Sequence, residues 1–146
     1  MRTADRAAHT IAELALALTL IGIIAAIAFP PLAATSARWR LRAAAGDVVN
    51  AMTYAREAAL ARGVPSAVVI DEAAAEVRVT SGADTVFRRA LGALHGVSVA
   101  TSGDSVRFAP DGLATGVSNL TVLLMIGSRV DSVVVSRLGR VRWSGY

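Results

Sequence analysis

The sequence predicts an α+β fold, in which one long N-terminal helix continues into a domain of short β-strands. Two observations predict this fold. Apolar residues follow a helical repeat between residues 10 and 62, and from residue 66 the repeat changes to a period of two. The 146 residues leave room for one folded domain of ordinary size.

The composition is that of a chain with one strongly apolar segment. Hydrophobic residues make up 54% of the sequence and the mean hydropathy is +0.53, which is high for a soluble protein. The absence of cysteine excludes disulfides, thiolate metal sites and cysteine nucleophiles. All 15 basic residues are arginines, and the net charge of +4 is compatible with anionic partners without requiring them.

An uncharged apolar run extends from Leu14 to Phe29, with Glu13 directly before it. This run reaches across most of a hydrocarbon core, for which about 20 residues are usual. Two arginines lie ahead of it, and the positive-inside rule then keeps the N-terminus cytoplasmic and sends the C-terminal domain across the membrane. The run therefore predicts a single transmembrane helix.

Two simpler interpretations of this run stay open. It could be a secretory signal peptide that is cleaved after the A-x-A sequence at residues 26–28, which would release a soluble β domain. It could also be a plain single-pass anchor. Neither explains Glu13, because a carboxylate at this depth costs about 3 kcal/mol and usually marks a functional site with a partner.

Residues 8–30 resemble the N-terminus of type IV prepilins and pseudopilins. Ala8 stands at the last position of a short basic leader, and His9 at the first position of the mature chain. Glu13 matches the family's glutamate at the fifth mature position, and Pro30 its helix-distorting proline. The family usually has glycine and phenylalanine at the cleavage site, where this chain has Ala8 and His9.

The resemblance implies a processing and assembly pathway. A prepilin peptidase would remove residues 1–8 and methylate the new amine of His9, and Glu13 would meet the amine of a neighbouring subunit. Such a pairing is physically reasonable, since a buried carboxylate is tolerated when a cation meets it. The protein would be a single-pass protein of the bacterial inner membrane with a periplasmic C-terminal domain. Pro30 lacks an amide donor and would weaken the helix locally.

The resemblance and the periodicity together divide the chain into four parts. These are a leader (1–8), a transmembrane and assembly half of the helix (9–30), an amphipathic half (31–63) and a β domain (64–146). The amphipathic half carries one apolar stripe, made of Leu41, Ala45, Val48, Met52, Ala55 and Ala59. Arg62-Gly63-Val64-Pro65 predicts the end of the helix, and we expect the stripe to pack on a sheet.

Eight short strands are predicted after the helix. They lie at residues 66–71, 75–80, 85–90, 96–101, 105–108, 120–126, 132–136 and 140–143. Residues 110–119 are expected to form a loop, and His95 is expected in a turn. Asp71, Glu72 and Glu76 are expected to lie on a solvated hairpin.

The sequence offers no set of residues for catalysis. It has two histidines, its serines lack a base with an orienting acid, and it has no glycine-rich phosphate loop. We therefore expect no enzyme activity, no metal and no cofactor.

The C-terminal region resembles a narrower family. FAPDGLATG (108–116) and VVVSRLGRVRW (133–143) are similar to the globular domain of GspH/FimT minor pseudopilins. The resemblance implies a low-abundance subunit near the tip of a type II secretion pseudopilus or a type IV pilus, where it helps assembly to begin. In the pilus branch some members are DNA receptors in natural transformation, with a GRxR element that is Gly139-Arg140-Val141-Arg142 here.

The arginines of this region can also be interpreted from strand geometry. A two-residue turn at Leu138-Gly139 would place residue 137 opposite 140 and residue 135 opposite 142. Arg137, Arg140 and Arg142 would then share one face, with Val134, Val141 and Trp143 on the other. Three guanidiniums without an acid between them suit the phosphates of double-stranded DNA, bound without regard to sequence.

A simpler interpretation is that these arginines keep an exposed strand edge soluble. Arg129 and Arg107 could extend the arginine surface or pair with Asp131 and Asp104, and the sequence leaves both arrangements open.

Overall fold

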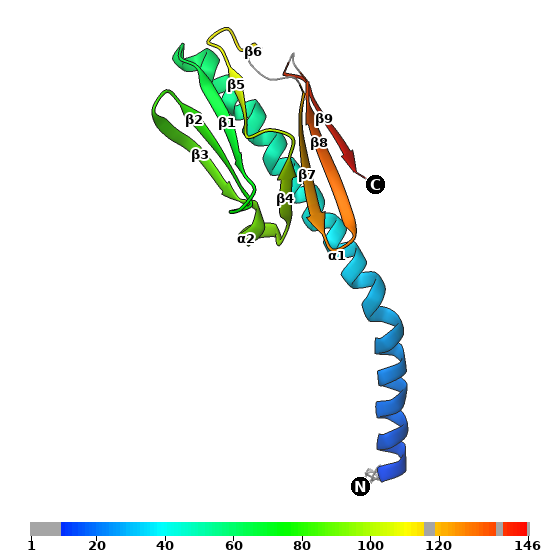
Figure 1. Ribbon diagram of the computed structural model, residues 1–146. Coiled ribbons are helices and arrows are strands. Elements are labelled where there is room, and N and C mark those ends of the chain that lie inside the picture. Colours follow the sequence, from blue (N-terminus) through cyan, green and yellow to red (C-terminus); the bar gives the residue numbers. More distant parts are fainter. Residues whose placement is uncertain (1–9, 116–118, 137–138, 146) are drawn as a thin grey trace, which may run out of the picture. The chain divides into compact units, whose positions relative to one another are not determined.

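The structure, a computed structural model, describes residues 10–115, 119–136 and 139–145, and only the backbone of 28–34. The chain forms two compact units, Met1–Ser36 and Ala37–Tyr146. The element order is α1 (Ile11–Arg62), β1 (Ser66–Asp71), β2 (Glu76–Ser81), β3 (Asp84–Ala90), α2 (Leu91–His95), β4 (Ser98–Thr101), β5 (Ser105–Phe108), β6 (Ala114–Thr115), β7 (Leu120–Ile126), β8 (Arg129–Val135) and β9 (Val141–Gly145) (Figure 1).

Helix α1 has 52 residues and confirms the predicted long helix. It ends where the sequence predicts, because Gly63 takes a left-handed φ of 64° and its amide closes the last turn on the Ala59 carbonyl at 3.0 Å. The helix continues through Pro30 without a break in its assignment. Within the described residues, no helix combines the length and the apolar character needed to cross a membrane.

The C-terminal half of α1 is the centre of the core. All six apolar positions of the predicted stripe are buried, with exposed fractions of 2% or less, and Ala44 and Ala51 join them. Five of these eight side chains are alanines, whose small size lets the strands approach the helix closely. Figure 1 shows this half of α1 running along both sheets of the domain.

Two antiparallel sheets cover the helix. One has five strands in the order β3-β2-β1-β5-β6, and the other has four in the order β4-β7-β8-β9. Their inward side chains alternate along each strand, so β1 buries Val68 and Ile70 while β8 buries Val133 and Val135. Phe108, at the end of β5, is the largest of the fully buried side chains. The α+β fold predicted from the sequence is thus confirmed.

Two short elements were not predicted. β6 occupies two residues of the expected loop 110–119 and pairs Ala114 with Phe108. α2 covers Leu91–His95, so His95 ends a helix and does not lie in a simple turn. Gly96 follows it with a left-handed φ of 63°, which makes it the C-cap of α2.

The expected solvated hairpin is wrong for Glu76. This residue is only 5% exposed, and its carboxylate lies between the two arginines that face each other across β2 and β3. Arg88 Nε donates to Glu76 Oε2 at 2.7 Å, and Arg78 Nε lies 3.3 Å from Oε1 without the alignment of a hydrogen bond. Glu76 is buried because it neutralises two like charges that would otherwise repel each other.

Candidate assembly and nucleic-acid-binding sites

The first site is the beginning of α1, where Glu13 lies in the first helical turn. The Thr10 hydroxyl accepts a hydrogen bond from the Glu13 amide at 3.2 Å, so Thr10 caps the helix. A threonine cap with glutamate three residues later has the sequence of a capping box, and a carboxylate is favoured there by the helix dipole. Glu13 is exposed, which leaves its carboxylate open to a partner.

The helix that follows Glu13 exposes its apolar side chains. Within the N-terminal unit, large hydrophobic side chains from Ile11 to Ile27 are 54–88% exposed. Exposed apolar surface of this extent indicates contact with lipid or with other protein chains.

Three of the residues predicted for processing and assembly cannot be placed in detail. Ala8 and His9 lie outside the described residues. Pro30 lies within α1, and its side chain is among those that the structure does not describe. Their roles stay predictions.

The second site is the loop between β8 and β9, and its geometry differs from the two-residue turn that we expected. The Ser136 amide donates to the Arg140 carbonyl at 2.9 Å, and the Arg140 amide donates to the Ser136 hydroxyl at 3.1 Å. Residues 136 and 140 therefore close a three-residue loop. Gly139 takes a φ of 73° in it, as the last residue of such a loop commonly does.

This loop moves the register of β9 by one residue. Val134 pairs with Arg142, and Val133 pairs with Trp143. Since opposite residues share a face, Arg142 lies with Val134 and not opposite it, which corrects the predicted arrangement. Val133 and Val135 are buried beneath the sheet, so the face that carries Arg142 is the outer one.

Arg140 and Arg142, which we call the β9 arginines, are both exposed. Within the described parts of the chain, neither guanidinium has an ion pair or a hydrogen bond. Arg137, the third arginine predicted here, lies outside the described residues. The β9 arginines thus offer two free guanidiniums, one on the edge strand β9 and one on the residue directly before it, an arrangement that can bind phosphate.

The sequence left open whether Arg107 and Arg129 extend the surface formed by the β9 arginines. They lie elsewhere. Arg107 lies on β5 of the five-stranded sheet, opposite Ala67 and Thr115. Arg129 lines a cavity together with Asp131, although the described residues show no ion pair between them. That cavity, which also contains Trp143, was not predicted from the sequence.

The polar residues around His95 have a structural role in the described ranges. His95 Nε2 lies 2.9 Å from Asp47 Oδ2, and Arg40 Nε donates to the His95 carbonyl at 2.6 Å, so the histidine anchors α2 to α1. Among these same residues, no group of three or more histidines and acids could hold a metal ion.

A long N-terminal helix, which exposes apolar side chains in its first half and is covered by two antiparallel sheets in its second half, defines a pilin-like protein. The profile of the family described as Type II transport protein GspH matches residues 44–139. The chain belongs to this family and is a minor pseudopilin or minor pilin of type II secretion or type IV pili.

Solved structures of such proteins share the fold. The type IV minor pilin FimU of Pseudomonas aeruginosa matches with a TM-score of 0.60 at 15% identity, covering 73% of this chain and 90% of that one. The minor pseudopilin EpsH from the Type 2 Secretion System of Vibrio cholerae matches with a TM-score of 0.55 at 13% identity, covering 73% and 97%. No match was found among the curated proteins.

Proposed function

We propose that this protein is a membrane-anchored assembly subunit near the tip of a type II secretion pseudopilus or a type IV pilus. Prepilin peptidase removes residues 1–8, and the helix from His9 onward anchors the mature chain in the inner membrane. The proposal assigns it no catalytic activity.

The observation that carries this proposal is the first turn of α1. Glu13 is a single carboxylate at the head of an exposed apolar helix, where a partner cation would neutralise it. The methylated amine of a neighbouring subunit supplies that cation. During assembly the apolar side chains exchange lipid contacts for contacts with other subunits.

The test is incorporation of Glu13 variants into filaments in cells that express the other subunits. We expect Glu13→Ala and Glu13→Gln to insert into the membrane normally and to incorporate at least about 10-fold less, as expected for the loss of a pairing of about 1.4 kcal/mol or more. Crosslinking to neighbouring subunits and quantitative immunoblotting of sheared filaments measure the effect.

Thr10→Ala is the matched control, because it removes the helix cap and keeps the carboxylate. We expect it to incorporate almost normally. Normal incorporation of Glu13→Gln would show that the charge has no role in assembly, and equal defects in Thr10→Ala and Glu13→Gln would assign the effect to the cap.

A second candidate function is sequence-independent binding of double-stranded DNA. It is favoured by the free guanidiniums of the β9 arginines, with Arg137 as a third contact and Gly139 shaping the loop. The edge strand β9 contains one glycine, one serine and no acid. Guanidiniums in this setting bind phosphates without reading base edges.

This function is tested with full-length protein in non-ionic detergent. The measured quantity is the reduction in the electrophoretic mobility of a DNA duplex at several salt concentrations. The double variant Arg140→Gln/Arg142→Gln should reduce the log–log salt slope by roughly 2, because each lost phosphate contact contributes about 0.9. Arg56→Gln/Arg62→Gln on α1 removes the same charge elsewhere and should leave the slope nearly unchanged. Equal effects of the two double variants would reject the β9 arginines as the binding site.

A further inference from the structure

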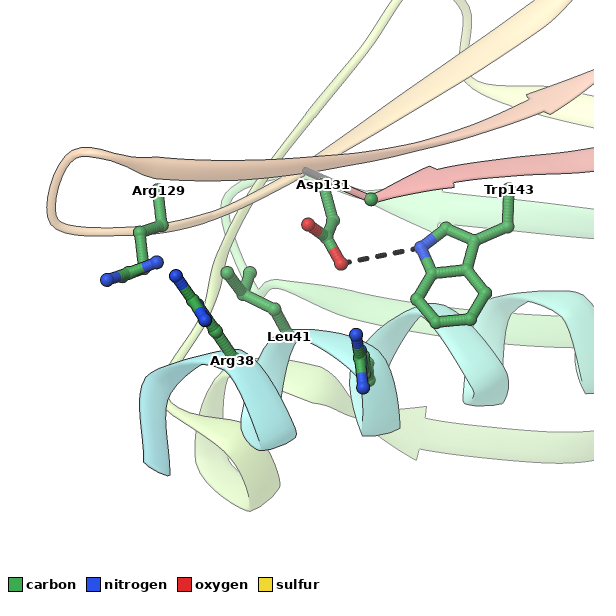
Figure 2. Close-up of a pocket in the computed structure, with 7 residues that line it drawn as sticks. Arg38, Leu41, Arg129, Asp131 and Trp143 are labelled. Atoms are coloured by element: carbon green, nitrogen blue, oxygen red, sulfur yellow. Dashed lines mark hydrogen bonds between the residues drawn. The ribbon is translucent and has the colours of Figure 1, made fainter. Parts of the chain in front are cut away.

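A cavity of about 300 Å³ opens in the C-terminal unit between α1 and the end of the four-stranded sheet. Arg38 and Arg42 line it from α1, and Arg129 and Asp131 line it from β8. Trp143 of β9 closes its far side (Figure 2). None of these residues is needed for the assembly contact or for the β9 arginines.

The cavity holds charges of both signs that do not satisfy each other. Within the described residues, Arg38, Arg42 and Arg129 form no ion pair, although all three line the same cavity. Like charges gathered in this way are disfavoured unless an anion joins them. Three guanidiniums with free donors match the oxygens of a phosphate group.

Asp131 adds a single acceptor to this basic site. It is only 5% exposed, and its Oδ2 accepts a hydrogen bond from Trp143 Nε1 at 3.4 Å (Figure 2). No donor to its other oxygen is found in the part of the chain that the structure describes. Gly145 keeps this carboxylate reachable, because a Cβ there would lie 3.1 Å from Oδ2. A buried carboxylate in such a place calls for a cationic group as well.

The cavity is lined by residues that follow the apolar run closely in the sequence. Eight residues, 30–37, separate Phe29, the end of that run, from Arg38. Of the two tryptophans of the protein, Trp143 lines the cavity, and Trp39 lies beneath Arg42, which also lines it. Trp39 is 65% exposed beneath the Arg42 guanidinium and Trp143 is 48% exposed, and tryptophan is enriched where membrane meets water.

We propose that this cavity binds the headgroup of a zwitterionic aminophospholipid. Arg38, Arg42 and Arg129 hold its phosphate, and Asp131 accepts hydrogen bonds from its ammonium group. The inference rests on the proposed anchoring of the N-terminal helix in a membrane. Binding would hold this cavity at the lipid surface before the subunit is assembled.

The test uses full-length protein in non-ionic detergent with the substitution Trp39→Phe, which leaves Trp143 as the single tryptophan. Its fluorescence is titrated with glycerophosphoethanolamine, with glycerophosphocholine and with inorganic phosphate. We expect a saturable change that is strongest for glycerophosphoethanolamine, since only this probe carries both the phosphate and N–H donors for Asp131.

Two variants separate the roles of the charges. Arg129→Gln should weaken the binding of both glycerophosphoethanolamine and phosphate about 10-fold. Asp131→Asn should weaken the binding of glycerophosphoethanolamine about 10-fold and leave the affinity for phosphate unchanged or higher. Retained phosphate binding shows that Asp131→Asn is folded, and Arg56→Gln controls for net charge. A site for anions alone would bind inorganic phosphate most tightly, would not distinguish glycerophosphoethanolamine from glycerophosphocholine and would show no selective effect of Asp131→Asn, which would overturn the proposal.

A membrane arm identifies the source of the headgroup. In nanodiscs, ethanolamine lipid should shield Trp143 from acrylamide more than choline lipid does, and Asp131→Asn should remove the difference. No response to any probe in either arm would also overturn the proposal. These measurements do not involve filaments. If no headgroup binding is found but incorporation into filaments still depends on Glu13, the proposed assembly function stands and the headgroup site alone is rejected.

Discussion

Gly139 lies against the ring of Phe108, so closely that a Cβ on the glycine would come within 3.3 Å of the ring atom Cε1. The same Cβ would lie 3.6 Å from the Cβ of Ala114. This contact joins the two segments that carry the resemblance to GspH/FimT proteins, FAPDGLATG and GRVR. The loop that presents the β9 arginines is therefore held by the core of the domain.

Gly139→Ala should lower the free energy of unfolding by about 2 kcal/mol. The left-handed φ of 73° costs an alanine about 1–2 kcal/mol, and the contact with Phe108 prevents the backbone from relaxing freely. Urea denaturation of the full-length protein in detergent, followed by tryptophan fluorescence, measures the change.

Gly127→Ala is its control, since Gly127 has a φ of 58° and no atom lies within 4 Å of the place that an alanine Cβ would take. Gly127→Ala should lower the free energy of unfolding by about 1 kcal/mol, because it adds the cost of the left-handed conformation without a steric contact. If both substitutions cost the same, the contact between Gly139 and Phe108 does not stabilise the domain.

Asp47→Ala should lower the free energy of unfolding by about 1–2 kcal/mol. This side chain is half-buried, lies 2.9 Å from His95 Nε2 and 3.9 Å from Arg89 Nε, and so ties both α2 and β3 to α1. Hydrogen exchange should report faster opening of α2. Asp84→Ala, at an exposed position with no such contacts in the described residues, should change stability by less than about 0.5 kcal/mol.

The long helix and most of the strands were predictable because burial imposes a clear period on them. The stripe from Leu41 to Ala59 repeats at intervals of four and three, and β1, β5 and β7 have the bounds that alternation predicts. In these elements the local pattern and the packing agree.

The register of β9 could not be predicted, because three consecutive valines (133–135) carry no alternation that would identify their buried side. A two-residue turn and a three-residue loop both accept glycine at position 139, and only the packed sheet selects the loop. One residue of difference moves Arg142 from the face of Val135 to that of Val134.

Other features depend on contacts between distant residues. α2 has five residues and is held by Asp47 and Arg40, which lie about 50 residues earlier in the chain. Glu76 is buried because Arg88 arrives from the next strand, and the cavity lined by Arg38, Asp131 and Trp143 forms only when α1, β8 and β9 meet. None of these partners is adjacent in the sequence, so periodicity gives no sign of them.

The most direct test of the central claim is the mass of the N-terminus of the native protein, isolated from membranes of cells that contain prepilin peptidase. The account predicts a chain that begins at His9 with a methyl group on its α-amine. A chain that begins at Phe29, or one that keeps residues 1–8, would contradict it.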